Sequence, residues 1–377
     1  MKKIKEICTV VSGSTPKTNV DDYWDGDIKW ITPAELTEDS FYLHDSVRHI
    51  TELGKEKTGL SYMPQGTVIL SSRAPIGKVA IAGCEMCCNQ GFKNLICSDV
   101  IFNEYLYYFL KSKTDYLNSL GRGATFKELS KSIVENIDIK VPALDKQKEI
   151  AGILGKVYEL VNLRKQQLSK LDELVKARFV ELFEDGESPI KTVEELCSAI
   201  VDCPHTTPKY EGELKNPAIR TTEIKKGYIA WETMRYVSDE EYEERTTRLK
   251  PEAGDIVYGR EGTFGNAAIL PKGYHFCLGQ RVMLLRPDYS KCTSEYLLYA
   301  VISDDVYRQA VGKNNASTVA HVNVKDVKQF KIPLPSFDKQ NQFAAFVEQT
   351  DKSKLAVLKS LEELETLKKS LMQQYFG

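Results

Sequence analysis

Two segments of the chain carry apolar residues at heptad spacing, with Arg164 and Arg178 interrupting the first. In residues 146–186 and 339–377 the heptad positions are Leu154, Val157, Val161, Leu168, Leu171, Val175 and Leu182, then Val347, Val357, Leu361, Leu364, Leu371 and Tyr375. Apolar residues at this spacing form a stripe along one side of an α-helix. Neither proline nor glycine interrupts residues 156–185 or 341–376, so each segment is predicted to be one long helix. About 30–35 residues rising ~1.5 Å each make a rod of roughly 45–52 Å.

An apolar stripe of this kind has two interpretations. The stripe can pack against the domain to which the helix belongs, or it can pack against a second helix. Here the stripe occurs twice at matching places, and each helix is too long for one small domain to cover. We therefore favour a coiled coil between the two long helices.

The remaining parts, residues 1–145 and 187–338, contain short apolar runs separated by Gly and Pro turns. The runs VILSS, KVAIA and NLICS in the first part, and DIVYG, AAILP and VMLLRP in the second, are typical of β-strands. Helices are expected around residues 104–113 and 295–302, and closing strands in ENIDIKVP and KQFKIPLP. Strands do not alternate regularly with long helices, so the predicted class is α+β.

An internal repeat organises the chain. The segment KIKEICTVVSGSTPK at 3–17 recurs as TVEELCSAIVDCPHTTPK at 192–209, with a three-residue insertion. Further matches in the same order are 30–36 with 218–224, 65–81 with 253–269, 103–110 with 294–301, and IKVPALDKQ at 139–147 with IPLPSFDKQ at 332–340. The offset drifts only from 188 to 193 residues, which indicates a tandem duplication of a domain followed by a long helix.

Composition narrows the class of protein. The 377 residues are 42% apolar and 28% charged, as in ordinary globular proteins, and no apolar run approaches the roughly 18 residues of a membrane span. The net charge of −2 and the pI near 6.3 count against an isolated nucleic-acid binder. They do not exclude one that concentrates Lys and Arg on one face, or that shares phosphate contacts with partner subunits.

Nine cysteines could suggest disulfides or a metal site. The first residues have no long apolar segment of an export signal, so we expect a cytoplasmic protein with reduced thiols. Two clusters contain possible metal ligands: Cys84, Cys87 and Cys88, then Cys197, Cys203 and His205. Neither has the paired spacing of a zinc site, and we favour structural thiols. No metal is expected.

Motifs for catalysis are weak. There is no phosphate-binding loop, and the glycine-rich segment 259–265 is interpreted as a tight turn. The chain also lacks the glycine-rich turn and the Asn/Asp-Pro-Pro-aromatic motif of a base methyltransferase. A nuclease would need two carboxylates and a lysine, for which Asp202 with Glu213 and Lys215, or Glu223 with Lys225, have loosely suitable spacing. The first copy does not reproduce either set, so we predict a chain without catalytic residues or a cofactor of its own.

The order of domain, long helix, related domain and long helix resembles the specificity subunit of type I restriction-modification systems, over essentially the whole chain. The most telling motifs are Gly13-Ser14-Thr15-Pro16 after an opening Ile-Lys-Glu-Ile helix, and the two closing motifs that end in Asp-Lys-Gln. The echo Thr206-Thr207-Pro208 is weaker, since the second copy has Asp202-Cys203-Pro204-His205 where the first has its glycine.

The resemblance implies that each globular part is a target recognition domain reading one half of a bipartite DNA site. The two helices would pack antiparallel, set the spacer and dock two methyltransferase subunits for adenine methylation. Cleavage would follow when restriction subunits join, and S-adenosylmethionine, ATP and Mg²⁺ would belong to these partners. A duplicated chain with a pseudo-two-fold axis suits duplex DNA, as dimeric repressors do.

Base contacts are expected from loop residues with forked donors, because Arg and Lys suit guanine while Asn and Gln suit adenine. In the first copy the candidates are Ser14, Thr15, Lys17, Ser72, Arg73, Lys78, Asn89, Gln90, Lys93, Arg122 and Lys127. In the second copy they are Thr206, Thr207, Lys209, Arg220, Arg260, Asn266, Gln280, Arg281, Lys313, Asn314 and Asn315. Two other readings stay open: a nuclease using Asp202, and a coiled-coil adaptor without a DNA role, which suits the acidic pI.

Overall fold

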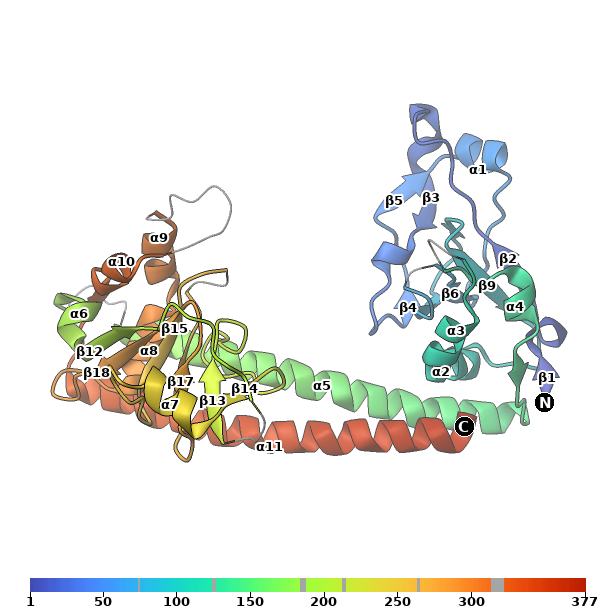
Figure 1. Ribbon diagram of the computed structural model, residues 1–377. Coiled ribbons are helices and arrows are strands. Elements are labelled where there is room, and N and C mark those ends of the chain that lie inside the picture. Colours follow the sequence, from blue (N-terminus) through green and yellow to red (C-terminus); the bar gives the residue numbers. More distant parts are fainter. Residues whose placement is uncertain (74, 124–126, 184–187, 212–214, 263–264, 313–321) are drawn as a thin grey trace. The chain divides into compact units, whose positions relative to one another are not determined.

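The computed structural model describes residues 1–377 except 74, 124–126, 184–187, 212–214, 263–264 and 313–321 (Figure 1). The chain divides into two compact units. Unit 1 contains residues 1–165 and 359–377, and unit 2 contains residues 166–358. Each unit therefore combines one globular part with segments of both long helices.

Unit 1 is built around a five-stranded sheet with the order β2-β9-β6-β7-β4. Its strands are β2 (Cys8–Ser12), β4 (Tyr42–Leu43), β6 (Val68–Ser71), β7 (Val79–Ala82) and β9 (Phe92–Cys97). A smaller sheet contains β5 (Arg48–Ile50), β3 (Trp24–Ile31) and β8 (Cys87–Cys88), and β1 (Lys2–Lys3) pairs with β10 (Asp138–Ile139). The helices are α1 (Glu52–Thr58), α2 (Asn103–Ser112), α3 (Thr114–Leu120) and α4 (Lys131–Glu135), with 3-10 turns at Ile4–Glu6, Asp21–Tyr23 and Pro33–Glu35.

Unit 2 repeats this plan with a four-stranded sheet in the order β12-β18-β15-β16. These strands are β12 (Cys197–Asp202), β15 (Ile256–Gly259), β16 (Ala267–Ile269) and β18 (Val282–Pro287). The smaller sheet contains β14 (Arg235–Val237), β13 (Asn216–Ile219) and β17 (Cys277–Leu278), and β11 (Ile190–Thr192) pairs with β19 (Lys331–Pro333). The helices are α6 (Val193–Leu196), α7 (Asp239–Arg245), α8 (Ser294–Val301), α9 (Asp304–Gly312) and α10 (Val324–Lys328).

The register of the small sheets shows that the repeat is structural. The central strand pairs in parallel with a short strand in both units: Trp30 with Cys87 in unit 1, and Ala218 with Cys277 in unit 2. The turn after β6 and the turn after β15 both contain a glycine with positive φ, Gly77 at +95° and Gly265 at +84°. Positive φ is unfavourable for residues with a Cβ, which explains why this glycine is kept. The predicted tandem α+β domains are confirmed.

Each globular part has its own apolar core, in which a short helix packs on the larger sheet. In α2 every residue from Tyr105 to Leu110 is buried, and in α8 Tyr296, Leu297 and Leu298 are buried. Strands β6 and β15 are buried along their whole length. A strand buried on both faces reads as a continuous apolar run, which is the pattern that VILS and IVYG show.

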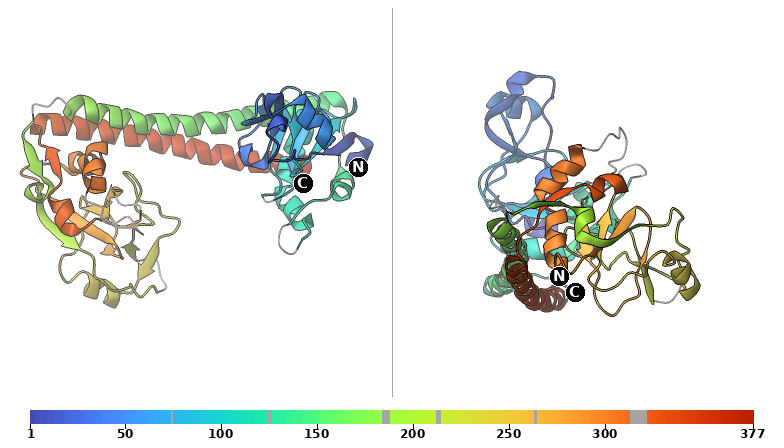
Figure 2. Two further views of the ribbon diagram at one scale, coloured as in Figure 1. Left: turned by 90° about the horizontal axis from the view of Figure 1, so that it is seen from above. Right: turned by 90° about the vertical axis from the view of Figure 1, so that its left-hand side faces the viewer.

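The two long helices are α5 (Leu144–Phe183) and α11 (Phe337–Phe376), of 40 residues each. In unit 1 the start of α5 lies beside the end of α11, as the views of Figures 1 and 2 agree, and Arg164 Nε donates to Ser360 Oγ at 3.2 Å. In unit 2 the Lys354 ammonium lies 2.7 Å from an Asp172 carboxylate oxygen. Within each unit the two helices run antiparallel, as predicted.

The heptad residues of both helices are buried or half-buried. Buried are Leu154, Val157, Val161, Val175, Val347 and Val357, and half-buried are Leu168, Leu171, Leu182, Leu361, Leu364, Leu371 and Tyr375. Four phenylalanines outside the predicted stripe add to these contacts. Phe376 packs 5.2 Å from Tyr105 in unit 1, and Phe183 packs 5.0 Å from Tyr296 and 5.3 Å from Phe343 in unit 2, where Phe179 joins them. The helix ends are thus anchored in the domain cores.

The Asp-Lys-Gln motifs fix the start of each long helix through a fully buried glutamine. Gln147 accepts a hydrogen bond from Phe102 N at 2.8 Å and donates to Val100 O and Pro142 O. Gln340 makes the matching set with Thr293 N, Lys291 O and Pro335 O. Each side chain pairs three backbone groups next to the start of its helix, and the amide itself is satisfied although it is buried. Both helices consequently begin before the predicted apolar stripe, at Leu144 and Phe337.

None of the helices in the described part of the chain is both long enough and apolar enough to cross a membrane.

Candidate nucleic-acid interface

In unit 1 the loop after β2 lies against the end of β8. Ser14 N donates to Cys88 O at 3.1 Å, and a Cβ on Gly13 would come within 2.1 Å of Asn89 O, so only glycine fits there. The Thr15 hydroxyl donates to the Gln90 side-chain oxygen. The buried Pro16 separates Thr15 from an exposed Lys17. The sequence-predicted residues of this loop and of the segment after β8 are therefore in direct contact.

Two tryptophans of β3 support the same loop through hydrogen bonds to its backbone. The indole N–H of Trp30 donates to Ser14 O at 3.0 Å, and that of Trp24 donates to Lys17 O at 3.1 Å. The rings meet edge to face at 5.2 Å, and the Arg48 guanidinium lies 3.6 Å from the centre of the Trp24 ring. Sequence reasoning missed this support, for which the aromatic residues of β3 were the only signal.

Next to this loop in unit 1, basic residues gather around Glu128. Arg73 Nε lies 3.0 Å and Lys93 Nζ 3.3 Å from the Glu128 carboxylate, while Arg122 pairs with Glu128 through the backbone. Lys93 is buried and also donates to the buried Ser72 hydroxyl. Ser72 N donates to Gly91 O at 2.8 Å, which joins this cluster to the Gln90 segment. Arg73 and Arg122 remain exposed, so they can reach a ligand.

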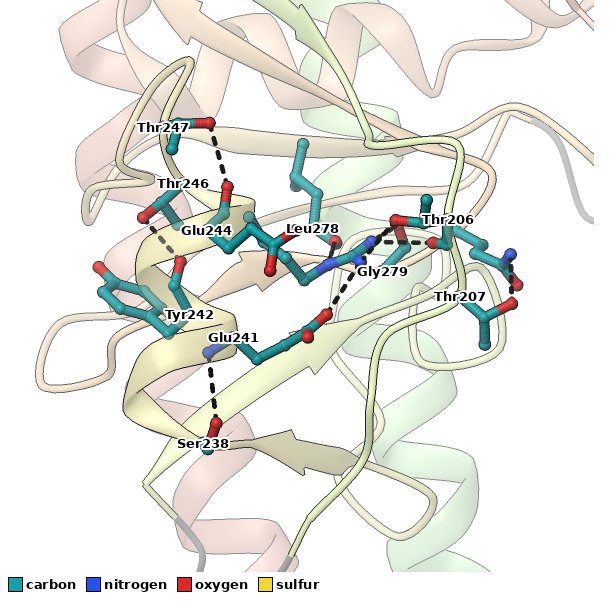
Figure 3. Close-up of polar contacts among 12 residues, drawn as sticks. Thr206, Thr207, Ser238, Glu241, Tyr242, Glu244, Thr246, Thr247, Leu278 and Gly279 are labelled. Atoms are coloured by element: carbon teal, nitrogen blue, oxygen red, sulfur yellow. Dashed lines mark hydrogen bonds and ion pairs between the residues drawn. The ribbon is translucent and has the colours of Figure 1, made fainter.

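The second unit presents the matching loop, Thr206-Thr207-Pro208-Lys209, on a different support. The Gln280 amide donates to the Thr207 hydroxyl at 3.0 Å, and Pro208 is buried while Lys209 is exposed. Beneath the loop, the buried guanidinium of Arg245 donates to Thr206 O, Leu278 O and Gly279 O at 3.0–3.2 Å (Figure 3). Glu241 balances its charge at 3.3 Å.

Around this second loop the charged residues are arranged differently from unit 1. Arg281 is exposed and lies 3.0 Å from the Glu261 carboxylate, with φ at +65°. Its counterpart in the first copy is Gly91. Left-handed backbone is costly for a residue with a Cβ and persists only where surrounding structure holds it. Arg281 is therefore a strained, exposed cation beside the loop, as expected of a functional residue.

Several candidate base readers are instead tied to their own domain. Ser72, Lys93 and Arg260 are buried, and Arg260 bonds Asp202 at 2.8 Å, so the prediction that they face a ligand is corrected to a structural role. Arg220 pairs with the buried Glu223 and donates to Thr233 O. Lys78, Asn89 and Asn266 donate or accept within the fold, through Leu36 O, Gly91 N and Ile224 O. Lys127 is exposed, whereas Lys313, Asn314 and Asn315 lie outside the described residues.

The two carboxylates of the nuclease alternative that the structure describes, Asp202 and Glu223, are occupied. Asp202 is paired with Arg260, and His205 lies 3.8 Å from its other oxygen. Burial alone would raise the pKa of Glu223, but hydrogen bonds from Arg220 and Thr222 outweigh this and lower it. A carboxylate already saturated by its own chain is a poor Mg²⁺ ligand. Glu213 lies outside the described residues.

The thiols lie mostly inside the fold. Cys8, Cys87, Cys88, Cys203, Cys277 and Cys292 are buried, and Cys84, Cys97 and Cys197 are half-buried. All nine are free. Among the described residues, no three His, Cys, Asp or Glu side chains are grouped as metal ligands would be.

Known proteins share this architecture. Residues 1–173 and 207–367 match the family model of the type I restriction modification DNA specificity domain. The MjaIX specificity subunit of Methanocaldococcus jannaschii is 41% identical over 197 residues, which cover 52% of this chain and 45% of that protein. The EcoKI specificity subunit of Escherichia coli is 23% identical over 414 residues, which cover 99% of this chain and 87% of that protein. The chain thus spans about half the length of the first of these relatives.

Solved structures show the same fold. The S subunit of a type I restriction-modification system from M. genitalium superposes with a TM-score of 0.58 at 16% identity, covering 100% of this chain and 95% of that one. A chain solved to explain the assembly and conformational transition of a type I R-M system gives 0.60 at 17% identity, covering 100% and 96%. With its two matched segments, the chain belongs to the family of the type I restriction modification DNA specificity domain.

Proposed function

We propose that this chain is the sequence-specificity subunit of a type I restriction-modification complex, and that each globular part reads one half of a bipartite DNA site. The observation that carries the proposal is the repeated loop pair. Thr15 with Gln90 and Thr207 with Gln280 occupy matching places in two copies of one fold, yet the charged residues around them differ. One scaffold with two different surfaces suits two half-sites of different sequence.

The base readers are the exposed cations beside each loop. In unit 1 these are Arg73, Arg122 and Lys127, and in unit 2 the strongest is Arg281. A guanidinium can donate two parallel hydrogen bonds to guanine O6 and N7, worth about 1–3 kcal/mol of discrimination. On binding DNA, Arg73 leaves the Glu128 carboxylate and Arg281 leaves the Glu261 carboxylate, and each guanidinium bonds a base instead. In the free protein these carboxylates balance the charge of the two arginines.

The long helices dock two methyltransferase subunits and set the spacer between the half-sites. Exposed apolar side chains on the helices support a docking role: Leu160, Leu163, Leu174, Val180, Leu355, Leu358 and Leu367. The methyltransferase and restriction subunits bind S-adenosylmethionine, ATP and Mg²⁺ and carry out the reactions, and this chain is not itself an enzyme. Inserting one helical turn into residues 158–180, with a matching turn in α11, should lengthen the spacer and leave both half-sites unchanged.

The test is to co-express the chain with the methyltransferase subunit encoded beside it and to map methylated adenines by single-molecule sequencing. The proposal predicts a split motif with two unlike halves around a fixed gap, which vanishes when this chain is omitted. Methylation that is identical without the chain would contradict it. Purified chain with DNA and Mg²⁺ provides the second arm, because cleavage there would favour the nuclease alternative.

A further inference from the structure

Three exposed or half-exposed polar residues recur at matching positions in the two copies. We call them the Thr–Lys–Gln group: Thr15, Lys17 and Gln90 in unit 1, and Thr207, Lys209 and Gln280 in unit 2. In each unit the threonine hydroxyl is hydrogen-bonded to the glutamine side chain, and a buried proline lies between the threonine and the lysine. The same two side chains are therefore in contact in both units, although the threonine is the donor in unit 1 and the glutamine in unit 2.

Residues that border the group are not shared. Arg73 of the first copy corresponds to Glu261 of the second, and Gly91 corresponds to Arg281, so size and charge change at both places. Side chains that read bases must differ if the half-sites differ. A group that stays the same is suited to a feature that both half-sites have in common.

The position of the group is maintained although its support has changed. The backbone oxygen just before the threonine, on Ser14 or on Thr206, accepts a hydrogen bond from a buried donor in both units. That donor is the Trp30 indole N–H in unit 1 and the Arg245 guanidinium in unit 2 (Figure 3). Two unrelated buried side chains thus hold the loop at the equivalent carbonyl, which is expected if the position of the loop matters for function.

The group also keeps donors free for a ligand. In unit 1 Thr15 donates to the Gln90 oxygen, which leaves both amide N–H groups of Gln90 available. In unit 2 Gln280 uses one amide hydrogen on Thr207 and keeps the other, and the Thr207 hydroxyl hydrogen is free as well. Lys17 and Lys209 form no ion pair with any residue that the structure describes. An ammonium, amide N–H groups and a hydroxyl are the donors that proteins use for phosphate oxygens.

We propose that the Thr–Lys–Gln group of each unit binds the phosphodiester backbone of its half-site and fixes the register of the domain on the duplex. The inference rests on the proposed function, and it assigns these residues to anchoring, whereas Arg73 and Arg281 read bases. Loss of a phosphate contact weakens binding to all DNA sequences equally. An adenine-reading glutamine would instead relax one base position.

Gln90→Glu is the decisive variant. The carboxylate still accepts the Thr15 hydroxyl hydrogen, so the loop stays braced, but the amide donors are lost and a negative charge faces the phosphate. Gln280→Glu is its counterpart in unit 2, where the free hydroxyl hydrogen of Thr207 takes over as the donor to the carboxylate. Lys17→Gln and Lys209→Gln each remove one positive charge near the phosphates and leave the hydrogen bond between threonine and glutamine intact. Unchanged melting temperatures confirm that every variant is folded.

The measurement is the dissociation constant for DNA of the complex between this chain and its methyltransferase subunits. The DNA set contains the mapped duplex, duplexes with each half-site base pair replaced, and duplexes with single methylphosphonates. Gln90→Glu should weaken binding roughly tenfold or more on every duplex, in line with ~1.5–3 kcal/mol for hydrogen bonds to charged groups. One methylphosphonate in the first half-site should weaken DNA binding by the wild type to a similar extent. The same methylphosphonate should weaken DNA binding by Gln90→Glu little further. Lys17→Gln should lower the slope of log K against log salt by about 0.9.

Two results would overturn the anchor. A loss confined to one replaced base pair would make Gln90 a base reader, and unchanged binding of Gln90→Glu would make the group a brace only. The proposed function fails differently: a wild-type complex that binds every duplex equally contradicts sequence reading, while a uniform loss in Gln90→Glu would still support the anchor. A wild-type complex that binds no DNA would overturn both.

Discussion

The two units hold the same loop with different chemistry. In unit 1 the carbonyls of Ser14 and Lys17 receive hydrogen bonds from two tryptophans that pack against each other. In unit 2 the carbonyl of Thr206 receives one from Arg245, a cation buried with Glu241. The duplicated feature is the path of the backbone, and the side chains beneath it were free to diverge as long as a buried donor remained.

This comparison also separates framework from surface. Gln147 and Gln340 make the same three contacts in both units, because both long helices must begin at the same place on their domain. Gly91 and Arg281, in contrast, occupy matching places on the candidate interface and share neither size nor charge. Divergence is therefore concentrated where the half-sites would be read.

The largest expected effect comes from removing the buried cation. Arg245→Met leaves Glu241 uncompensated and three backbone oxygens unsatisfied, and we expect a loss of about 3–5 kcal/mol in the stability of unit 2. Trp30→Phe keeps an aromatic side chain but removes the indole hydrogen bond and leaves a small cavity, which should cost unit 1 about 1–3 kcal/mol. Hydrogen exchange of amides in each unit measures both. Equal losses would mean that the two supports are energetically alike.

The framework glutamines should behave as a matched pair. Gln147→Leu and Gln340→Leu keep the volume and leave buried backbone groups unpaired, so each should lower the free energy of unfolding by about 2–4 kcal/mol. The two losses should agree within about 1 kcal/mol, as measured by urea denaturation with unit-resolved hydrogen exchange. A large difference would show that the shared contacts do not carry equal weight.

Arg281→Gly gives the second copy the residue of the first. Glycine relieves the left-handed strain at +65°, so stability should stay the same or rise by up to about 1 kcal/mol. Recognition should relax at one base pair of the second half-site by about 1–3 kcal/mol, while Arg73→Ala should act only on the first. The mapped methylation motif reports both effects. Relaxation in the wrong half, or none, would remove Arg281 from the base readers.

The smallest effect is a difference in pH dependence. Burial lowers the pKa of Lys111 to about 8, whereas the matching residue of unit 2 is the buried Ile302. Between pH 8 and the unfolded pKa, the unfolded chain binds a proton that folded Lys111 does not, so the stability of unit 1 should rise with pH. Lys111→Ile should flatten this rise from about pH 8 to 9.5 in thermal unfolding. An identical pH profile in the variant would contradict the shift.

The sequence was sufficient for the features that depend on local pattern. The heptad positions predicted both long helices, and the repeat predicted two α+β domains and matched Thr15 with Thr207 and Gln90 with Gln280. Arg245 could not be found this way, because it comes from α7, in a segment whose residues have no clear match in the first copy. Its contacts with Leu278 and Thr206 join residues more than 30 positions apart. Buried candidates such as Lys93 were chosen for their donors, and only the sheet register shows that those donors point inward.

One measurement tests the central claim, that each domain reads its own half-site, most directly. The ladders β1–β10 and β11–β19 pair at matching positions, Lys2 with Ile139 and Lys191 with Ile332, so residues 4–138 can replace residues 193–331. Single-molecule sequencing of DNA methylated with this chain should then show a motif made of the first half-site twice, around a fixed gap. A motif that still contains the original second half-site would contradict the account.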